Sequence, residues 1–337
     1  MKEQTIVLVD AYSQIFRAFY AVRMLTNSRK EPVNAAFVFT KLLLQLEKKH
    51  ASDYGAMLFD CGKVDFRLAI NPQYKANRPP MPEALKKQIP LIRRISGAFG
   101  WQLMQHEGYE ADDLIGGIAG KYCNFPVKIV SGDKDLSQLV DQRVTMLIPA
   151  SGGGFEERGV EEVIGKFGVA PEEMVDYLAL IGDNSDNITG VPGIGPKGAV
   201  EILRTFGPAQ NWLDAPDKID AGSRVGMKLL PELETVRRNR ELIRLKLELP
   251  GGVADGQMPP RRGEPDWEEI RWICEDNSFK SILRDLPETF SRKPAKKAVA
   301  ADDTDDLFSF ASAVNEAGER AAETEKDEPQ EIQGELF

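Results

Sequence analysis

Three apolar runs, each ending in an acidic residue, constrain the fold of this chain more than any other feature. Residues 5–10 read Thr-Ile-Val-Leu-Val-Asp, residues 54–60 read Tyr-Gly-Ala-Met-Leu-Phe-Asp, and residues 127–135 read Val-Lys-Ile-Val-Ser-Gly-Asp-Lys-Asp. Such runs are typical of strands buried on both faces. Helical periodicity over residues 35–46 lies between the first two runs. We therefore expect an α/β fold with a mostly parallel central sheet flanked by helices.

The acids that end these runs are Asp10, Asp60, Asp133 and Asp135. Ligands bind at the carboxyl ends of the strands in open α/β sheets, so these side chains are candidates for a shared site. A lone aspartate at a strand end is as often a cap for the next helix, and turns are rich in aspartate. The repetition of the pattern favours a site.

Five further acids occur at similar junctions. Glu110, Asp112 and Asp113 open an apolar helical pattern, where acids also commonly compensate the helix dipole. Asp183 and Asp186 are three residues apart, so they share one side of a helical turn. The nine candidates are Asp10, Asp60, Glu110, Asp112, Asp113, Asp133, Asp135, Asp183 and Asp186.

Carboxylates without histidine or cysteine favour hard cations. The chain has only two histidines, and its three scattered cysteines do not form a zinc motif. Oxygen ligands select Mg²⁺ or Mn²⁺. Nine acids exceed the needs of one ion, so we expect two ions about 3.5–4 Å apart that promote an in-line displacement at phosphorus. The outlying acids would act through bound waters.

A proline-broken segment after the second strand mixes basic and aromatic residues. It carries Lys63, Arg67, Lys75, Arg78, Lys86 and Lys87, with Phe66 and Tyr74 among them. This mixture suits phosphate contact and base stacking, although a solvated charged loop explains it equally well. A helix is expected over residues 83–99.

A glycine-rich hairpin, Gly190-Val-Pro-Gly-Ile-Gly-Pro-Lys-Gly198, follows the last pair of acids and opens a helical pattern. Its backbone N–H groups are suited to bind a phosphate without reading base sequence. It is also a tight turn between helices, and both interpretations can hold. Helices are further expected within residues 160–181, 207–250 and 267–286.

The net charge of −10 does not exclude a polyanionic partner. Twelve acids and two basic residues lie from residue 298 to the end, which leaves 41 of each sign in the rest of the chain. If nine acids converge, the remaining surface of that part is basic. Residues 291–337 have little to bury, and we expect them to be disordered. The few cysteines and the absence of a long apolar run favour a cytoplasmic protein without a signal peptide or membrane anchor.

Residues 5 to about 290 resemble the 5′-nuclease domain of bacterial DNA polymerase I and, more distantly, phage 5′-exonucleases and flap endonucleases. The motifs that carry the resemblance are Leu8-Val-Asp10, Phe59-Asp60, Tyr74-Lys-Ala-Asn-Arg-Pro-Pro-Met-Pro82, Glu110-Ala-Asp-Asp113, Gly132-Asp-Lys-Asp135, Gly182-Asp-Asn-Ser-Asp-Asn187 and Gly190-Val-Pro-Gly-Ile-Gly195. Ala11 and Gly198 depart from the family pattern, but neither change removes a candidate ligand.

The resemblance implies a PIN-like α/β core over residues 1–170 with a helical arch near 62–100. It implies a helical region over 171–290 with a helix-three-turn-helix, followed by an acidic tail over 291–337. The implied reaction is two-metal 5′-3′ exonuclease and flap endonuclease cleavage of DNA by a stand-alone monomer. All nine acids would hold metals, Lys75 and Arg78 would contact the scissile phosphate, and Tyr74 would stack on a base. Further DNA contacts would come from Arg17, Gly190, Gly193, Gly195 and Lys197, with K⁺ at the hairpin.

The last residues, Gln333-Gly-Glu-Leu-Phe337, resemble the peptide by which bacterial replication proteins bind the sliding clamp, with Gly334 in place of the usual leucine. A frayed terminus is the alternative. Two rivals to the nuclease assignment also remain. One is a PIN-type ribonuclease, and the other is a DNA-structure-binding protein without turnover.

Overall fold

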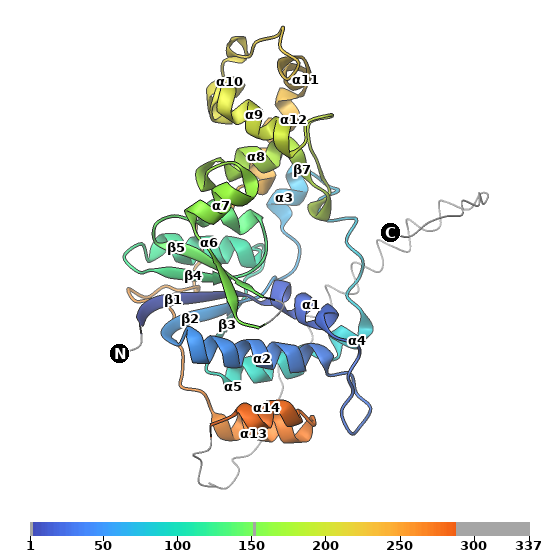
Figure 1. Ribbon diagram of the computed structural model, residues 1–337, viewed down its shortest axis with the longest axis vertical. Coiled ribbons are helices and arrows are strands. Elements are labelled where there is room, and N and C mark those ends of the chain that lie inside the picture. Colours follow the sequence, from blue (N-terminus) through green and yellow to red (C-terminus); the bar gives the residue numbers. More distant parts are fainter. Residues whose placement is uncertain (1–2, 151–152, 288–337) are drawn as a thin grey trace, which may run out of the picture.

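The computed structural model describes residues 3–150 and 153–287, so the acidic tail and its terminal peptide lie outside the described residues. A six-stranded sheet forms its centre (Figure 1). In sheet order the strands are β3 (Gln102–Met104), β2 (Ser52–Leu58), β1 (Glu3–Asp10), β4 (Val127–Val130), β5 (Val144–Pro149) and β6 (Phe155–Arg158). Only β6 runs antiparallel to its neighbour. The predicted mostly parallel sheet is confirmed.

Alternate residues of β1 enter two different cores, as the two-residue period of a strand requires. Ile6 and Leu8 face one side, and Val7 and Val9 face the other. The second side is covered by α1 (Ala11–Ala21), α2 (Asn34–Lys49) and α5 (Ile89–Ala98), and α13 (Trp267–Asp276) and α14 (Lys280–Asp285) pack beyond α2 and α5 in the same apolar cluster (Figure 1). The first side is covered by α6 (Ala111–Lys121), α7 (Val160–Phe167) and α8 (Met174–Ile181).

A helical region continues from α8 and forms the far end of the molecule (Figure 1). It contains β7 (Gly182–Asp183), η3 (Asn184–Asp186), β8 (Ile188–Thr189), α9 (Pro196–Phe206), α10 (Ala209–Leu213), η4 (Pro216–Lys218), α11 (Gly226–Leu229), η5 (Leu230–Glu232) and α12 (Leu233–Ile243). Shorter elements before it are α3 (Asp65–Ile70), α4 (Glu83–Lys86), η1 (Asp135–Leu139) and η2 (Pro171–Glu173). No helix in the described part of the chain is both long enough and apolar enough to span a bilayer.

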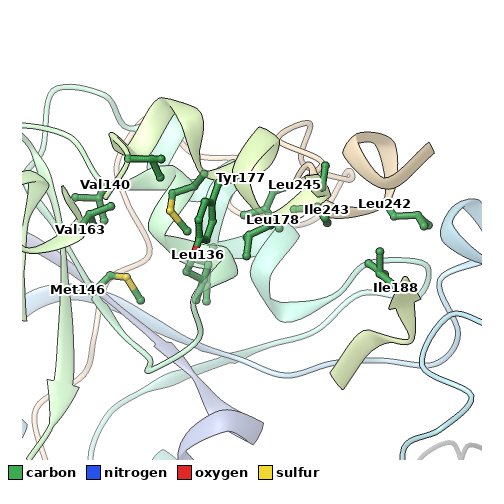
Figure 2. Packing of buried hydrophobic residues seen from close by; sticks show 14 of the residues in the cluster. Leu136, Val140, Met146, Val163, Tyr177, Leu178, Ile188, Leu242, Ile243 and Leu245 are labelled. Atoms are coloured by element: carbon green, nitrogen blue, oxygen red, sulfur yellow. The ribbon is translucent and has the colours of Figure 1, made fainter. Parts of the chain in front are cut away.

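One apolar core joins the sheet to this helical region. Figure 2 shows Met146 of β5, Leu136 of η1 and Leu178 of α8 in the same cluster as Leu242 and Ile243 at the end of α12. Burying each such side chain contributes roughly 1.5–3 kcal/mol. The position of α12 relative to the strand ends is therefore fixed by packing.

Three predicted helices are each divided in two. Residues 83–99 form α4 and α5, because Pro90, near the start of α5, has no N–H to continue an α-helical ladder. Residues 160–181 form α7 and α8, since Gly168 adopts φ +78° at the end of α7. Residues 267–286 form α13 and α14, with Ser278 at φ +62° between them.

Candidate functional site

The ends of three adjacent parallel strands position the first group of acids. Asp10 is the last residue of β1, Asp60 follows β2, and Asp133 follows β4. Asp10 also caps α1, because Ser13 N donates to Oδ1 at 3.2 Å, and Ser131 Oγ donates to Oδ2 at 2.9 Å. The cap and the site are therefore compatible roles of one carboxylate.

The N-terminus of α6 adds Glu110, Asp112 and Asp113. Asp60 Oδ1 accepts from the backbone N–H of Ala111 at 2.8 Å, which ties the end of β2 to the start of this helix. Glu110 is the N-cap residue, and its N–H donates to Asp113 Oδ2 at 3.2 Å. Acids at this helix end are favoured by the helix dipole, which explains why the sequence tolerates three of them.

A second group of acids consists of Asp135, Asp183 and Asp186. One oxygen of each carboxylate lies within 4.8 Å of the others. Asp135 Oδ1 is buried and has no hydrogen-bond partner. Lys134 Nζ contacts Asp183 Oδ2 at 2.8 Å, and no comparable charge is paired with Asp135 among the described residues. A carboxylate that has an unpartnered buried oxygen and lies close to two other carboxylates fits a cation site.

Burial and mutual repulsion shift the pKa values of several acids in this cluster. Burial, with the charges of Asp60 and Asp133, raises the pKa of Asp10 to about 7. Burial and neighbouring acids also raise the pKa values of Asp112 and Asp135 well above the ordinary aspartate value. At Asp183, burial is outweighed by hydrogen bonds from Lys134 and Ser185, so its pKa is lowered. Such repulsion is relieved by a bound cation.

Residues 74–78 lie over the acids and supply the nearest positive charges. Lys75 Nζ is 2.5 Å from Glu110 Oε1 and 3.7 Å from Asp186 Oδ2. Arg78 Nη2 is 2.5 Å from Asp186 Oδ1. The backbone N–H of Lys75, a residue at φ +57°, donates to Asp186 O at 3.1 Å. The predicted phosphate-contacting residues therefore lie directly against the predicted metal-binding acids.

Tyr74 is placed differently from the prediction that it stacks on a base. The residue is only 8% exposed, and its hydroxyl donates to Asp186 Oδ2 at 2.9 Å. A buried ring has no free face for a base in this conformation. In the part of the chain that the structure describes, Arg17 does not pair with any of the nine acids. Its guanidinium donates instead to the carbonyl oxygen of Pro149.

The glycine hairpin begins directly after the second group of acids. Gly190 packs against the backbone at Gly182, where a Cβ would meet Ile181 C at 2.3 Å. Gly195 is the N-cap of α9, and Pro196 and Lys197 are its first residues. Lys228 Nζ donates to Gly193 O at 2.8 Å. A cavity of about 380 Å³ lies between hairpin and acids, lined in part by Lys134, Asp183 and Gly195.

Two residues in this arrangement have roles that the sequence did not indicate. Arg67 is buried and contacts both Glu110 and Asp113, although the sequence placed it only among the basic residues of a loop. Lys134, between the two aspartates of the third strand end, pairs with Asp183. Neither partner is close in the chain, so only the fold brings these residues together.

Comparisons with known proteins agree with this geometry. A family model described as the 5′-3′ exonuclease N-terminal resolvase-like domain matches residues 5–168, and one described as the 5′-3′ exonuclease C-terminal SAM fold matches residues 169–264. A 5′-3′ exonuclease of Aquifex aeolicus is 35% identical over 289 residues, which cover 85% of this chain and 96% of that protein. The chain belongs to the 5′-3′ exonuclease family.

Other relatives of this 5′-3′ exonuclease family member are longer. DNA polymerase I of Bacillus caldotenax is 36% identical over 306 residues, which cover 88% of this chain but 34% of the polymerase. The chain thus spans about a third of the polymerase relatives it matches.

Solved structures share the fold of this exonuclease family member. Zinc-bound T5 5′-exonuclease has a TM-score of 0.59 at 22% identity, over 84% of this chain and 99% of that one. The catalytic core of Rad2 in complex with a DNA substrate has a TM-score of 0.55 at 16% identity, over 85% and 92%. At these identities the likeness concerns the fold alone.

Proposed function

We propose that the chain is a divalent-metal-dependent 5′-3′ exonuclease and flap endonuclease that hydrolyses DNA phosphodiester bonds in primer removal and repair. The proposal rests on Asp135, which has an unpartnered buried oxygen and lies close to the carboxylates of Asp183 and Asp186. Asp183 and Asp186 have basic partners, but among the described residues no basic side chain pairs with Asp135, so a bound cation would relieve the repulsion at this carboxylate.

The residues present fit two hard cations, Mg²⁺ or Mn²⁺. Asp135, Asp183 and Asp186 would hold one. Asp10, Asp60, Asp112 and Glu110, with Asp133 between the groups, would hold the other directly or through waters. When bound, such ions supply an activated water and counter-charge for a leaving oxygen.

The chain's own cations would then act on the substrate. Lys75 and Arg78 are held by Glu110 and Asp186, so a phosphate bound next to these acids would lie within their reach. Guanidinium and ammonium groups at that position neutralise phosphate charge and orient the scissile bond. Arg17 is assigned a more peripheral phosphate contact, since it is an exposed cation on α1.

The hairpin is assigned to the duplex. Gly190, Gly193 and Gly195 keep its backbone free of side chains, and Lys197 begins α9, so a phosphate can approach the helix N-terminus. A K⁺ would bind carbonyl oxygens of this turn. The carbonyl oxygen of Gly193 already accepts a hydrogen bond from the Lys228 ammonium, so this turn binds a positive charge. These contacts would be independent of base sequence.

A labelled 5′ flap substrate tests this function. With Mg²⁺ we expect a product cut near the flap junction and short 5′ products, and with EDTA we expect neither. Asp183→Asn should retain flap binding in EDTA and lose most cleavage in Mg²⁺. Binding without cleavage in the unmodified protein would favour a DNA-structure-binding protein, whereas cleavage of RNA alone would favour a PIN-type ribonuclease.

The terminal peptide and the solution state are part of the same proposal. A protein of this kind would act as a monomer in the cytoplasm on nucleoid DNA, tethered to the sliding clamp by residues 333–337. Deleting these five residues should abolish clamp binding and leave flap cleavage in the absence of clamp unchanged. Clamp binding that survives the deletion would dispose of the tether.

A further inference from the structure

Asp113 differs from the other acids of the cluster because its carboxylate is fully paired. It has no exposed surface, and Arg67 donates to both its oxygens at 2.7 Å. The backbone N–H of Lys246 donates to Oδ1 at 2.9 Å, and that of Glu110 donates to Oδ2 at 3.2 Å. Two carboxylate oxygens offer about four acceptor sites, so these donors leave none for a metal.

Arg67 is the centre of these contacts and links its own helix, α3, to two further elements. It is 1% exposed on α3. Besides the bidentate contact with Asp113, its Nη1 donates to Glu110 Oε2 at 3.1 Å, and its Nε donates to Leu242 O at 3.0 Å. One planar guanidinium thus joins the start of α6 to the end of α12. Only arginine has donors in a fork that can make all these bonds together.

Helix α12, which Arg67 contacts, is itself bonded to the base of the hairpin. Asn239 of α12 lies one turn before Leu242 and is completely buried. Its Nδ2 donates to Thr189 O at 2.8 Å, just before Gly190, and to Ala179 O at 3.0 Å. The helix that receives Arg67 is therefore fixed to the base of the hairpin by a buried side chain.

We propose that Arg67 and Asp113 form a positioning pair and that Asp113 is not a metal ligand. Asp113 holds the guanidinium in one orientation, and the guanidinium holds the carboxylate of Glu110 toward Lys75 and the metal-binding acids. The same guanidinium sets the distance between those acids and α12, which supports the hairpin. This role rests on the proposed metal-dependent cleavage, since it concerns the alignment of its ligands.

The test uses the full-length chain with Arg67→Met, Asp113→Asn and the double variant Arg67→Met/Asp113→Asn. The double variant guards against misfolding, because removing one partner leaves an uncompensated buried charge whereas removing both does not. Arg67→Lys keeps the charge but not the fork. The matched control is Arg240→Met/Asp176→Asn, which removes a buried ion pair (2.7 Å) from the helical region. Asp60→Asn serves as a ligand variant.

Two measurements are made on each protein. One is Mn²⁺ binding by calorimetry without DNA, and the other is single-turnover flap cleavage as a function of Mg²⁺ concentration. We expect the double variant to bind as many Mn²⁺ ions as the unmodified protein, while its cleavage rate falls roughly 10- to 100-fold, as for other groups that orient ligands. Both single variants and Arg67→Lys should show similar losses, and the double variant should be no slower than either single variant.

The opposite pattern overturns the inference. If Asp113 were a ligand, Asp113→Asn would bind fewer ions, as Asp60→Asn should, and Arg67→Met would bind Mn²⁺ at least as tightly as the unmodified protein. An equal rate loss in the Arg240→Met/Asp176→Asn control would reduce the effect to general destabilisation and also contradict the inference. Absence of Mg²⁺-dependent cleavage in the unmodified protein would instead refute the proposed function, so the two failures are distinguishable.

Discussion

At the scale of single residues, Asp10 shows that one acidic side chain can stabilise a helix as its cap and yet lower the stability of the folded protein when it is ionised. Asp10 stabilises α1 by accepting the N–H of Ser13, yet burial and nearby acids raise its pKa to about 7. A carboxyl whose folded-state pKa exceeds its unfolded-state value costs stability when it is ionised. For Asp10 that cost appears as pH rises from about 4, the ordinary aspartate pKa, to about 7.

This conflict predicts that Asp10→Asn stabilises the metal-free protein. In EDTA at pH 8 the melting temperature should rise by a few degrees, roughly 2–4 °C for each kcal/mol. At pH 5, which is only a little above the ordinary aspartate pKa, just the early part of this cost has developed, so the rise should be clearly smaller than at pH 8. Thermal melts at both pH values check the sign, and flap cleavage in Mg²⁺ should be lost. A lower melting temperature at both pH values would show that the cap, rather than repulsion, dominates.

A second prediction concerns Lys75, which forms ion pairs with acids that are proposed to bind metal. Lys75→Met removes a cation 2.5 Å from Glu110 Oε1, so metal ions need no longer compete with it. Without DNA we expect Mn²⁺ to bind about fivefold more tightly, on the order of 1 kcal/mol, while cleavage falls. The control is Lys86→Met, whose partner Glu83 is a surface residue. Calorimetry that finds equal or weaker binding for Lys75→Met would contradict the competition.

At the scale of secondary-structure elements, strand ends were predictable and helix breaks were not. Parallel strands bring their carboxyl ends to one edge, so the sequence pattern was enough to predict that Asp10, Asp60 and Asp133 meet. The separation of α4 from α5 depends on Pro90, which the prediction of one helix over 83–99 overlooked. The burial of Tyr74 depends on residues distant in the chain, and no local pattern indicates it.

The hairpin offers a prediction at this scale. Gly190→Ala places a Cβ 2.3 Å from Ile181 C, so backbone must move, at a cost of about 1–3 kcal/mol or more. Gly165→Ala is the matched control, because the Cβ meets no atom within 4 Å and the site lies within α7. That change should stabilise by about 0.5–1 kcal/mol. Denaturant unfolding should therefore separate the two variants in opposite directions, and equal midpoints would contradict the close approach.

At the scale of the whole molecule, one continuous core joins the sheet to the helical region and fixes the geometry between acids and hairpin. Leu136, Leu178 and Leu242 come from three elements in this core (Figure 2). The sequence indicated which acids to expect, but it did not indicate that Arg67 would pair with both carboxylate oxygens of Asp113. That pairing needs α3, α6 and α12 to converge, and convergence follows from packing that no single segment encodes.

The convergence of acids on a cation site is tested most directly by diffraction from crystals soaked in Mn²⁺, with data at the manganese absorption edge. We expect anomalous density among Asp135, Asp183 and Asp186, further density near Asp10, Asp60 and Asp112, and none within ligand distance of Asp113. Crystals whose acids bind no manganese at saturating concentration would contradict the metal-dependent mechanism.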